Sequence, residues 1–89
     1  MVSIRSYYGD SATSQNNAKL VTVDHVKFYF SYETLIAVEP LNSALIIRQN
    51  DWGPTTGKHL NAVDGGSKEA KAKRLSSDDF MVAIKQYNI

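Results

Sequence analysis

The sequence has no cysteine, only two prolines and five glycines among its 89 residues, and no long hydrophobic run. Without cysteine there is no disulfide, no cysteine-ligated zinc site and no thiol nucleophile, which suits a reducing compartment. Nothing approaches the roughly 20 apolar residues that span a bilayer, and the start of the chain lacks the apolar run of a signal peptide. We therefore expect a cytoplasmic protein with no membrane partner.

The chain also lacks an excess of either charge. Ten basic and nine acidic residues leave a net charge of +1, which gives no strong overall field toward nucleic acid or a membrane. Hydrophobic residues are not scarce: they make up 43% of the chain, and aromatic residues 10%. That composition is typical of a folded core and excludes disorder by composition. A length of 89 residues fits one domain, so we expect residues 1–89 to fold as a single unit.

The clearest strand pattern lies at residues 26–31, where Val26, Phe28 and Phe30 alternate with polar neighbours. Residues 20–23 either begin this strand or form a separate one. Two further runs, 34–39 and 44–49, flank the turn sequence of residues 40–43 and predict a hairpin. Both runs are apolar on both faces, which predicts strands near the centre of the sheet. Shorter strands are expected at residues 71–75 and, unless its side chains simply dock on the core, around Ile4, Tyr7 and Tyr8.

A C-terminal amphipathic helix is predicted at residues 77–87, because Phe80, Ala83, Ile84 and Tyr87 recur at helical spacing. Ser76 or Ser77 can cap it. A short helix near residues 55–63, capped by Thr55 and ended by Gly65 or Gly66, is also expected. Residues 9–19 are polar and predict a surface loop or arm.

The fold class that follows is α+β. We expect a small antiparallel sheet of three to four strands, with the C-terminal helix packed on one face and a short helix near residues 55–63. The expected core is Val26, Phe28, Phe30, Leu35, Ile36, Val38, Leu45, Ile47, Leu60, Phe80 and Ile84, with Trp52 at its rim.

Residues 52–61 hold the only tryptophan together with several polar side chains. As a recognition surface, the segment would use Trp52, Thr55, Thr56, Lys58, His59 and Asn61. The alternative is structural: the tryptophan covers the core, Thr55 caps the helix, and His59 and Asn61 hold neighbouring loops. The structural interpretation is the one we favour.

A local basic run is the second candidate binding segment. Lys68, Lys71, Lys73 and Arg74, together with the aromatic strand at residues 28–30, suggest a nucleic-acid surface. A solvated loop beside a core strand explains the same residues, and it is our preferred reading. Free strand edges offer a third recognition mode, although the sequence does not show which edge is free.

Catalytic patterns are sparse. The two histidines, His25 and His59, have Asp24, Asp51 and Asp64 as acids elsewhere in the chain, but none is placed at the spacing of a known metal or nucleophile motif. We expect no enzyme, no cofactor and no metal, with a small hydrolase or nucleotide-processing enzyme as the remaining alternative.

Two strings in the middle third of the chain carry a resemblance. The first is Phe30-Ser31-Tyr32-Glu33-Thr34-Leu35-Ile36-Ala37, and the second comprises Asp51-Trp52 and Thr55-Thr56-Gly57-Lys58-His59-Leu60-Asn61. Together they resemble a group of small uncharacterised bacteriophage proteins that share the patterns SYxTxxA and W-S-x-T-T-x-K-H-hydrophobic-N. Gly53 departs from that pattern, which has Ser after the tryptophan.

The resemblance implies a viral origin and work in the cytoplasm of an infected bacterium, and it implies no catalytic residue. We therefore expect a noncatalytic accessory module that binds a host or viral protein. A nucleic-acid-binding accessory protein is the alternative, and self-association into a homo-oligomer is left open.

Overall fold

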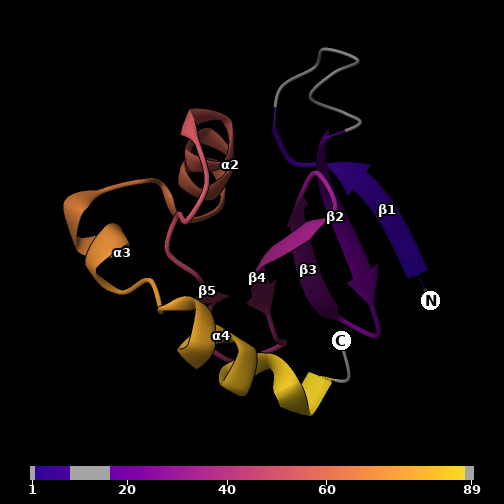
Figure 1. The fold of residues 1–89 in the computed structure, drawn as a ribbon. Helices are drawn as coiled ribbons and strands as arrows, with labels where there is room; N and C mark the ends of the chain where they lie inside the picture. Colours follow the sequence, from indigo (N-terminus) through magenta and orange to yellow (C-terminus); the bar gives the residue numbers. More distant parts are fainter. Residues whose placement is uncertain (1, 9–16, 88–89) are drawn as a thin grey trace.

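The protein is an α+β domain, as the sequence predicts (Figure 1). The computed structural model describes residues 2–8 and 17–87. Its strands are β1 (Val2–Ser6), β2 (Ala18–Val23), β3 (Val26–Ser31), β4 (Thr34–Glu39) and β5 (Ile46–Ile47). Its helices are α2 (Pro54–Asp64), α3 (Lys68–Ala72) and α4 (Ser77–Ile84), followed by the 3-10 turn η1 (Lys85–Tyr87).

The strands form one antiparallel sheet in the order β1-β2-β3-β4-β5. It has five strands where three to four were predicted, because β1 pairs with the sheet and β2 is a strand of its own. Most of the predicted loop at residues 9–19 lies outside the described residues. The prediction was wrong for its last two residues, Ala18 and Lys19, which belong to β2. There Ala18 pairs with Ser31 and is fully buried.

Tight turns join the central strands. Val23 pairs with Val26, which leaves Asp24 and His25 as a two-residue turn with φ values of 49° and 71°. Tyr32 begins the next turn and also has a positive φ, of 55°. Asp and His tolerate this left-handed region better than most residues, and Tyr does so less readily. The first turn therefore suits its sequence, while the second requires support from the packing around it.

A β-bulge divides the apolar residues of β4 between the two faces of the sheet. Tyr29 pairs with Ala37 and Phe30 with Leu35, so Ile36 is an extra residue with no partner on β3. The bulge lets Leu35 and Val38 pack on the face covered by α4, while Ile36 and Ala37 pack on the face covered by α2. The doubly apolar pattern of this strand was thus correctly predicted to be covered on both sides.

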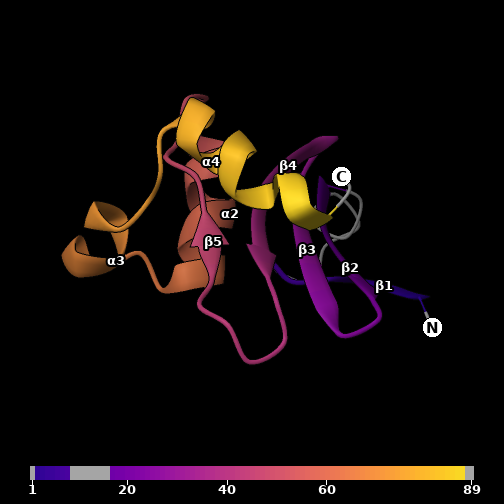
Figure 2. The same cartoon turned by 90° about the horizontal axis from the view of Figure 1, so that it is seen from below.

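Each face of the sheet has its own core cluster. On one face, Phe28 and Val38 pack with Phe80 and Ile84 of α4. Figure 2 shows this helix lying alongside the sheet. On the other, Ile36, Ala37 and Ile47 pack with Leu60 of α2, and Tyr7 packs at the margin. Of the predicted core, Phe28, Ile36, Val38, Ile47, Leu60, Phe80 and Ile84 are buried, and Val26, Phe30, Leu35 and Leu45 are half-buried. Ala18, Leu20 and Ala37 are buried but were not predicted.

The C-terminal helix matches its prediction. The hydroxyl of Ser76 accepts a hydrogen bond from the Asp79 N–H at 3.2 Å and caps α4. Phe80 and Ile84 point into the core, as the predicted stripe requires. The last predicted turn continues as the 3-10 helix η1.

The short helix also exists, but it starts differently. Pro54 occupies the first turn of α2, the N-cap is Gly53, and no side chain caps the helix, so the prediction that Thr55 is the cap was wrong. Proline already has the φ of a helix and needs no N–H there, which explains the start. Gly65 ends α2 at φ 87°, as predicted, and its N–H donates to the Asn61 carbonyl at 2.8 Å.

The predicted strand at residues 71–75 was wrong. Residues 68–72 form α3, capped by Ser67, whose hydroxyl accepts a hydrogen bond from the Ala70 N–H at 3.1 Å. Of the predicted strand, Leu75 forms a single parallel bridge to Arg48.

Residues 44–49 were predicted to form a central strand, and the structure differs in the length and the position of that strand. The turn after β4 is confirmed by a hydrogen bond from Ser43 N–H to the Pro40 carbonyl at 3.4 Å. However, β5 contains only Ile46 and Ile47, and it is the last strand of the sheet rather than a central one. Leu75 accepts from Gln49 N–H at 2.7 Å and donates to the Ile47 carbonyl at 2.8 Å, so the outer side of β5 is partly occupied.

Candidate functional site

Trp52 lies at the rim of the core, where it covers a buried arginine. The Arg48 guanidinium carbon is 4.7 Å from the centre of the Trp52 ring and 5.1 Å from the centre of the Phe80 ring. Arg48 also donates a hydrogen bond to the Ser77 hydroxyl and lies 4.0 Å from an Asp51 carboxylate oxygen. Trp52 is nevertheless 44% exposed, so part of its ring is accessible to a partner.

The turn that carries Trp52 is fixed by Asn50. Its side-chain oxygen accepts from the Trp52 N–H at 3.0 Å, and its side-chain nitrogen donates to the Gly53 carbonyl at 3.1 Å. Local side-chain bonds of this type stabilise turns.

Thr56 and His59 join α2 to the sheet. The Ser31 hydroxyl at the end of β3 lies 3.1 Å from the Thr56 hydroxyl and 2.7 Å from His59 Nδ1. Thr56 and His59 are three residues apart and therefore share one face of the helix. Ser31 and His59 are each only 2% exposed. Both side chains thus help to join α2 to the sheet; a structural role had been favoured for His59, and none had been considered for Thr56.

Three tyrosine rings surround the His59 imidazole. The ring centres of Tyr7, Tyr8 and Tyr32 lie 6.1, 5.2 and 5.9 Å from it. Tyr7 is itself held by a hydrogen bond from its hydroxyl to the Phe30 carbonyl at 2.8 Å. Burial lowers the pKa of His59 and raises the pKa of Tyr7, because it disfavours the charged form of each side chain.

Acid should therefore destabilise the fold through His59. Its folded-state pKa lies below the ordinary value of about 6.5, so the unfolded chain binds a proton more readily, and the free energy of unfolding falls as the pH drops below that value. Urea denaturation of wild type at pH 7.5 and 5.5 should show this loss, and His59→Gln should show a smaller difference between the two pH values.

His25→Asn is the matched control, because His25 is exposed and Asn also tolerates a positive φ. The reduction of the pH difference in His59→Gln should exceed the change in His25→Asn. An unchanged pH difference in His59→Gln would contradict the assignment to His59.

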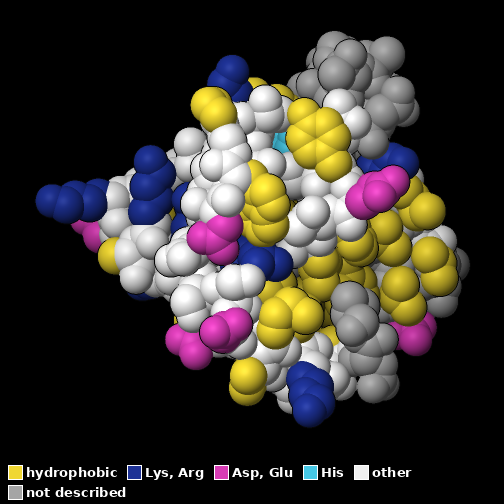
Figure 3. All heavy atoms as spheres, viewed as in Figure 1, with side chains coloured by type: hydrophobic (Ala, Val, Ile, Leu, Met, Phe, Trp, Pro, Cys, Tyr) yellow, Lys and Arg dark blue, Asp and Glu magenta, His cyan; other side chains and the backbone are white. Residues whose placement is uncertain are grey.

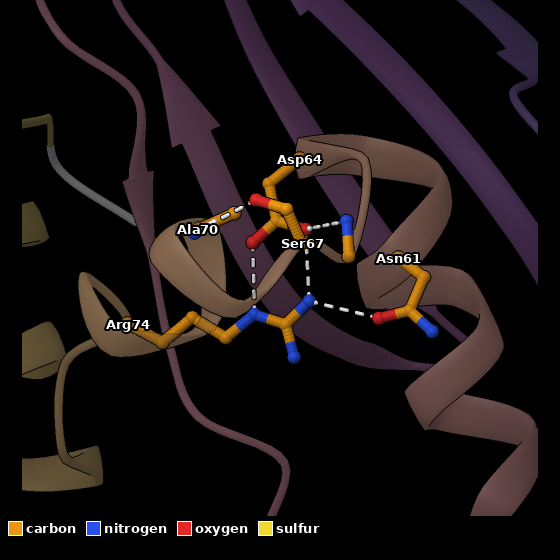
Figure 4. Close-up of polar contacts among 6 residues, drawn as sticks. Asn61, Asp64, Ser67, Ala70 and Arg74 are labelled. Carbon is orange, nitrogen blue, oxygen red and sulfur yellow. Dashed lines mark hydrogen bonds and ion pairs between the residues drawn. The ribbon is translucent and has the colours of Figure 1, made fainter.

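Asn61 accepts a hydrogen bond from Arg74, which forms an ion pair with Asp64 between α2 and the segment after α3 (Figure 4). Arg74 Nε and Nη2 donate to the two Asp64 carboxylate oxygens, each at 2.8 Å, and Nη2 also donates to the Asn61 side-chain oxygen at 3.1 Å. The Gly66 N–H donates to Asp64 at 2.9 Å. Although burial favours the neutral acid, the bonds from Arg74 and Gly66 lower the pKa of Asp64.

The candidate residues therefore separate into two groups. Thr56 and His59 are buried and join α2 to the sheet, whereas Trp52, Thr55, Lys58 and Asn61 are exposed, with Asn61 bonded to Arg74. In the basic run, Lys68, Lys71 and Lys73 are exposed, but the Arg74 side chain is only 6% exposed and is paired with Asp64. Of the predicted aromatic nucleic-acid surface, Phe28 is buried in the core.

Strand β1 has exposed side chains that the sequence did not identify as candidate site residues. It forms one end of the sheet, and its Val2 and Ile4 side chains are 62% and 66% exposed. In Figure 3 hydrophobic side chains gather over the region where Figure 1 places β1 to β3. Beside β1, Val21, Val23 and Val26 are only half-buried against the core. The short, weakly patterned N-terminal sequence gave no indication that this strand ends the sheet.

One comparison with known proteins identifies a family. A family model described as "Family of unknown function (DUF8033)" matches residues 2–82. The chain belongs to this family. No curated protein and no solved structure matches the chain significantly. The match agrees with the predicted resemblance to proteins without an established activity, while the bacteriophage origin stays a prediction.

Two further observations concern the described residues alone. None of their helices is long and apolar enough to cross a membrane. Within the same part of the chain, no group of three or more His, Asp or Glu side chains is arranged to hold a metal ion.

Proposed function

We propose that this family member is a noncatalytic protein-binding module that accepts a partner strand along the outer edge of β1. The observation that carries the proposal is the exposure of Val2 and Ile4 on a strand that ends the sheet. An outermost strand presents unpaired N–H and C=O groups, which bind extended segments of other proteins. The opposite edge is less available, because Leu75 is bonded to residues 47 and 49 beside β5.

The polar residues of the core support a noncatalytic role. Ser31 and His59 are hydrogen-bonded as a nucleophile and a base could be, but both are buried, and the Ser31 hydroxyl is also bonded to Thr56 of α2. With each side chain only 2% exposed, neither is accessible to a substrate in this arrangement. Their geometry is better explained by the packing of α2 on the sheet.

The alternative of nucleic-acid binding has weaker support. It would rely on Lys68 and Lys71 of α3 and on Lys73, which follows the helix, because Arg74 is occupied by Asp64. The resemblance to small bacteriophage proteins supports a host or viral protein as the partner, bound in the cytoplasm of the host.

A charge placed on β1 should abolish partner capture. We expect Ile4→Glu to recover about tenfold less partner than wild type, since burying an unpaired carboxylate at an interface is costly. The measurement is affinity capture from a lysate of the cells in which the protein naturally occurs, quantified by mass spectrometry. The thermal midpoint of the variant should stay near that of wild type, because Ile4 is mostly exposed in the free protein.

Two further variants make the result specific. Leu41→Glu adds the same charge at a similarly exposed side chain in the β4–β5 loop, and it should capture partner normally. Trp52→Ala tests the other exposed candidate. A partner that is lost with Trp52→Ala and retained by Ile4→Glu would overturn the proposal.

A further inference from the structure

The pairing of β1 with β2 shows which side chains would meet an incoming strand. Val2 is opposite Val23 and Ile4 is opposite Val21, so these apolar residues lie on the face covered by α4. Arg5 is opposite Leu20 and therefore lies on the other face, where Tyr29 pairs with Leu20. A strand added to β1 would meet the two aliphatic side chains on one face and Arg5 on the other, because directly opposite residues share a face.

The two aliphatic side chains call for apolar residues on the partner. Val2 and Ile4 extend the row of half-buried valines Val21, Val23 and Val26 beyond the part of the sheet that packs against α4. Apolar cross-strand pairs stabilise a sheet, and they would remove these side chains from water.

The charge of Arg5 calls for an acid on the partner. Strands β1 and β2 contain two basic residues, Arg5 and Lys19, and no acidic one. Arg5 is exposed and forms no ion pair with a described residue. Glu39 influences the pKa of Tyr29, as Arg5 does, but its carboxylate already has two partners. It lies 3.8 Å from Lys27 Nζ and accepts a hydrogen bond from the Tyr29 hydroxyl at 3.3 Å.

Within the described part of the chain, β1 also lacks common protection against strand addition. Proteins often protect an outer strand with proline, a bulge or several charges. Strand β1 has no proline, its register with β2 is continuous over all five residues, and its one charge is Arg5.

We infer that the partner is an acidic, apolar-alternating strand that pairs antiparallel with β1. Read in its own direction, it carries a carboxylate opposite Arg5, an apolar residue opposite Ile4, a hydroxyl opposite Ser3 and an apolar residue opposite Val2. The inference rests on the proposed function and adds the chemistry of the partner. A second copy of β1 fits less well, because its sequence Val-Ser-Ile-Arg-Ser offers the apolar residues and no carboxylate.

The test uses two labelled peptides and measures fluorescence anisotropy with the full chain. One peptide has the core Glu-Val-Thr-Ile, and the other has Lys in place of Glu. Wild type should bind the Glu peptide about fivefold more tightly, since opposite charges across a strand pair attract and like charges repel. Arg5→Glu should reverse the preference, and Ile4→Glu should weaken both peptides.

The outcomes separate this inference from the proposed function. Equal binding of both peptides to wild type, or an unchanged preference in Arg5→Glu, would overturn the acidic partner while leaving strand addition at β1 intact. Binding that Ile4→Glu does not weaken would overturn the proposed function as well. If neither peptide binds and analytical ultracentrifugation shows a dimer that Ile4→Glu dissociates, the edge belongs to a second copy and the inference is wrong.

Discussion

Arg74→Met is expected to lower the free energy of unfolding by about 3–5 kcal/mol, because it leaves the Asp64 carboxylate buried without its partner. The two side chains are only 6% and 7% exposed, and the pair has two charge-assisted hydrogen bonds of 2.8 Å. Urea denaturation followed by circular dichroism measures the change. The loss should be largest near neutral pH, where Asp64 is ionised, and smaller once acid protonates it.

Two controls distinguish the ion pair from the general effect of removing a cation. Lys73→Met removes the neighbouring exposed charge and should change the stability by less than about 0.5 kcal/mol. The double variant Asp64→Leu, Arg74→Met should recover much of the loss, because no unpaired charge remains. Equal losses for Arg74→Met and Lys73→Met would refute the importance of the pair.

Phe80→Ala should destabilise the protein by a similar amount, about 3–5 kcal/mol, because it opens a cavity in the core between α4 and the sheet. Phe80 is 0% exposed, packs with Phe28 and Val38, and also supports the Arg48 guanidinium. Small domains have only about 5–15 kcal/mol in total, and a chain of this size is at the lower end. We therefore expect the variant to be substantially unfolded at 37 °C, as judged by loss of the cooperative thermal transition.

Met81→Ala provides the comparison within the same helix. Met81 is exposed on α4, so its truncation should change the thermal midpoint only slightly. If Phe80→Ala kept a wild-type thermal transition, the assignment of Phe80 to the centre of this core would be wrong.

Local patterns predicted the elements whose residues follow a single period. Strand β3 alternates without interruption, and the stripe of α4 is regular and capped by Ser76, so both were predicted within a few residues. Residues 71–75 were mistaken for a strand, because the Ser67 cap that starts α3 at Lys68 was not considered. The bulge at Ile36 was not predicted, since it depends on how β3 and β4 register against each other.

The candidate site shows the same limit. The polar residues of α2 were recognised, and their structural role was the favoured interpretation. The hydrogen-bond partner of His59 was not predicted. That partner, Ser31, is 28 residues away in the sequence, and the two side chains come together only because α2 packs on the sheet. Likewise, the exposure of Val2 and Ile4 depends on the order of all five strands, which no local pattern specifies.

The sequential order of the strands has a consequence for folding during synthesis. Every strand pairs with its neighbour in the chain, so the sheet can form from local contacts as it leaves the ribosome. Phe80 and Ile84 emerge later, because 37 residues separate Ile47 from Ile84 and translation at about 5–20 residues per second needs roughly 2–7 s for them. During that interval the nascent chain exposes Phe28 and Val38 to solvent, which makes this the period in which newly made chains most need protection from aggregation.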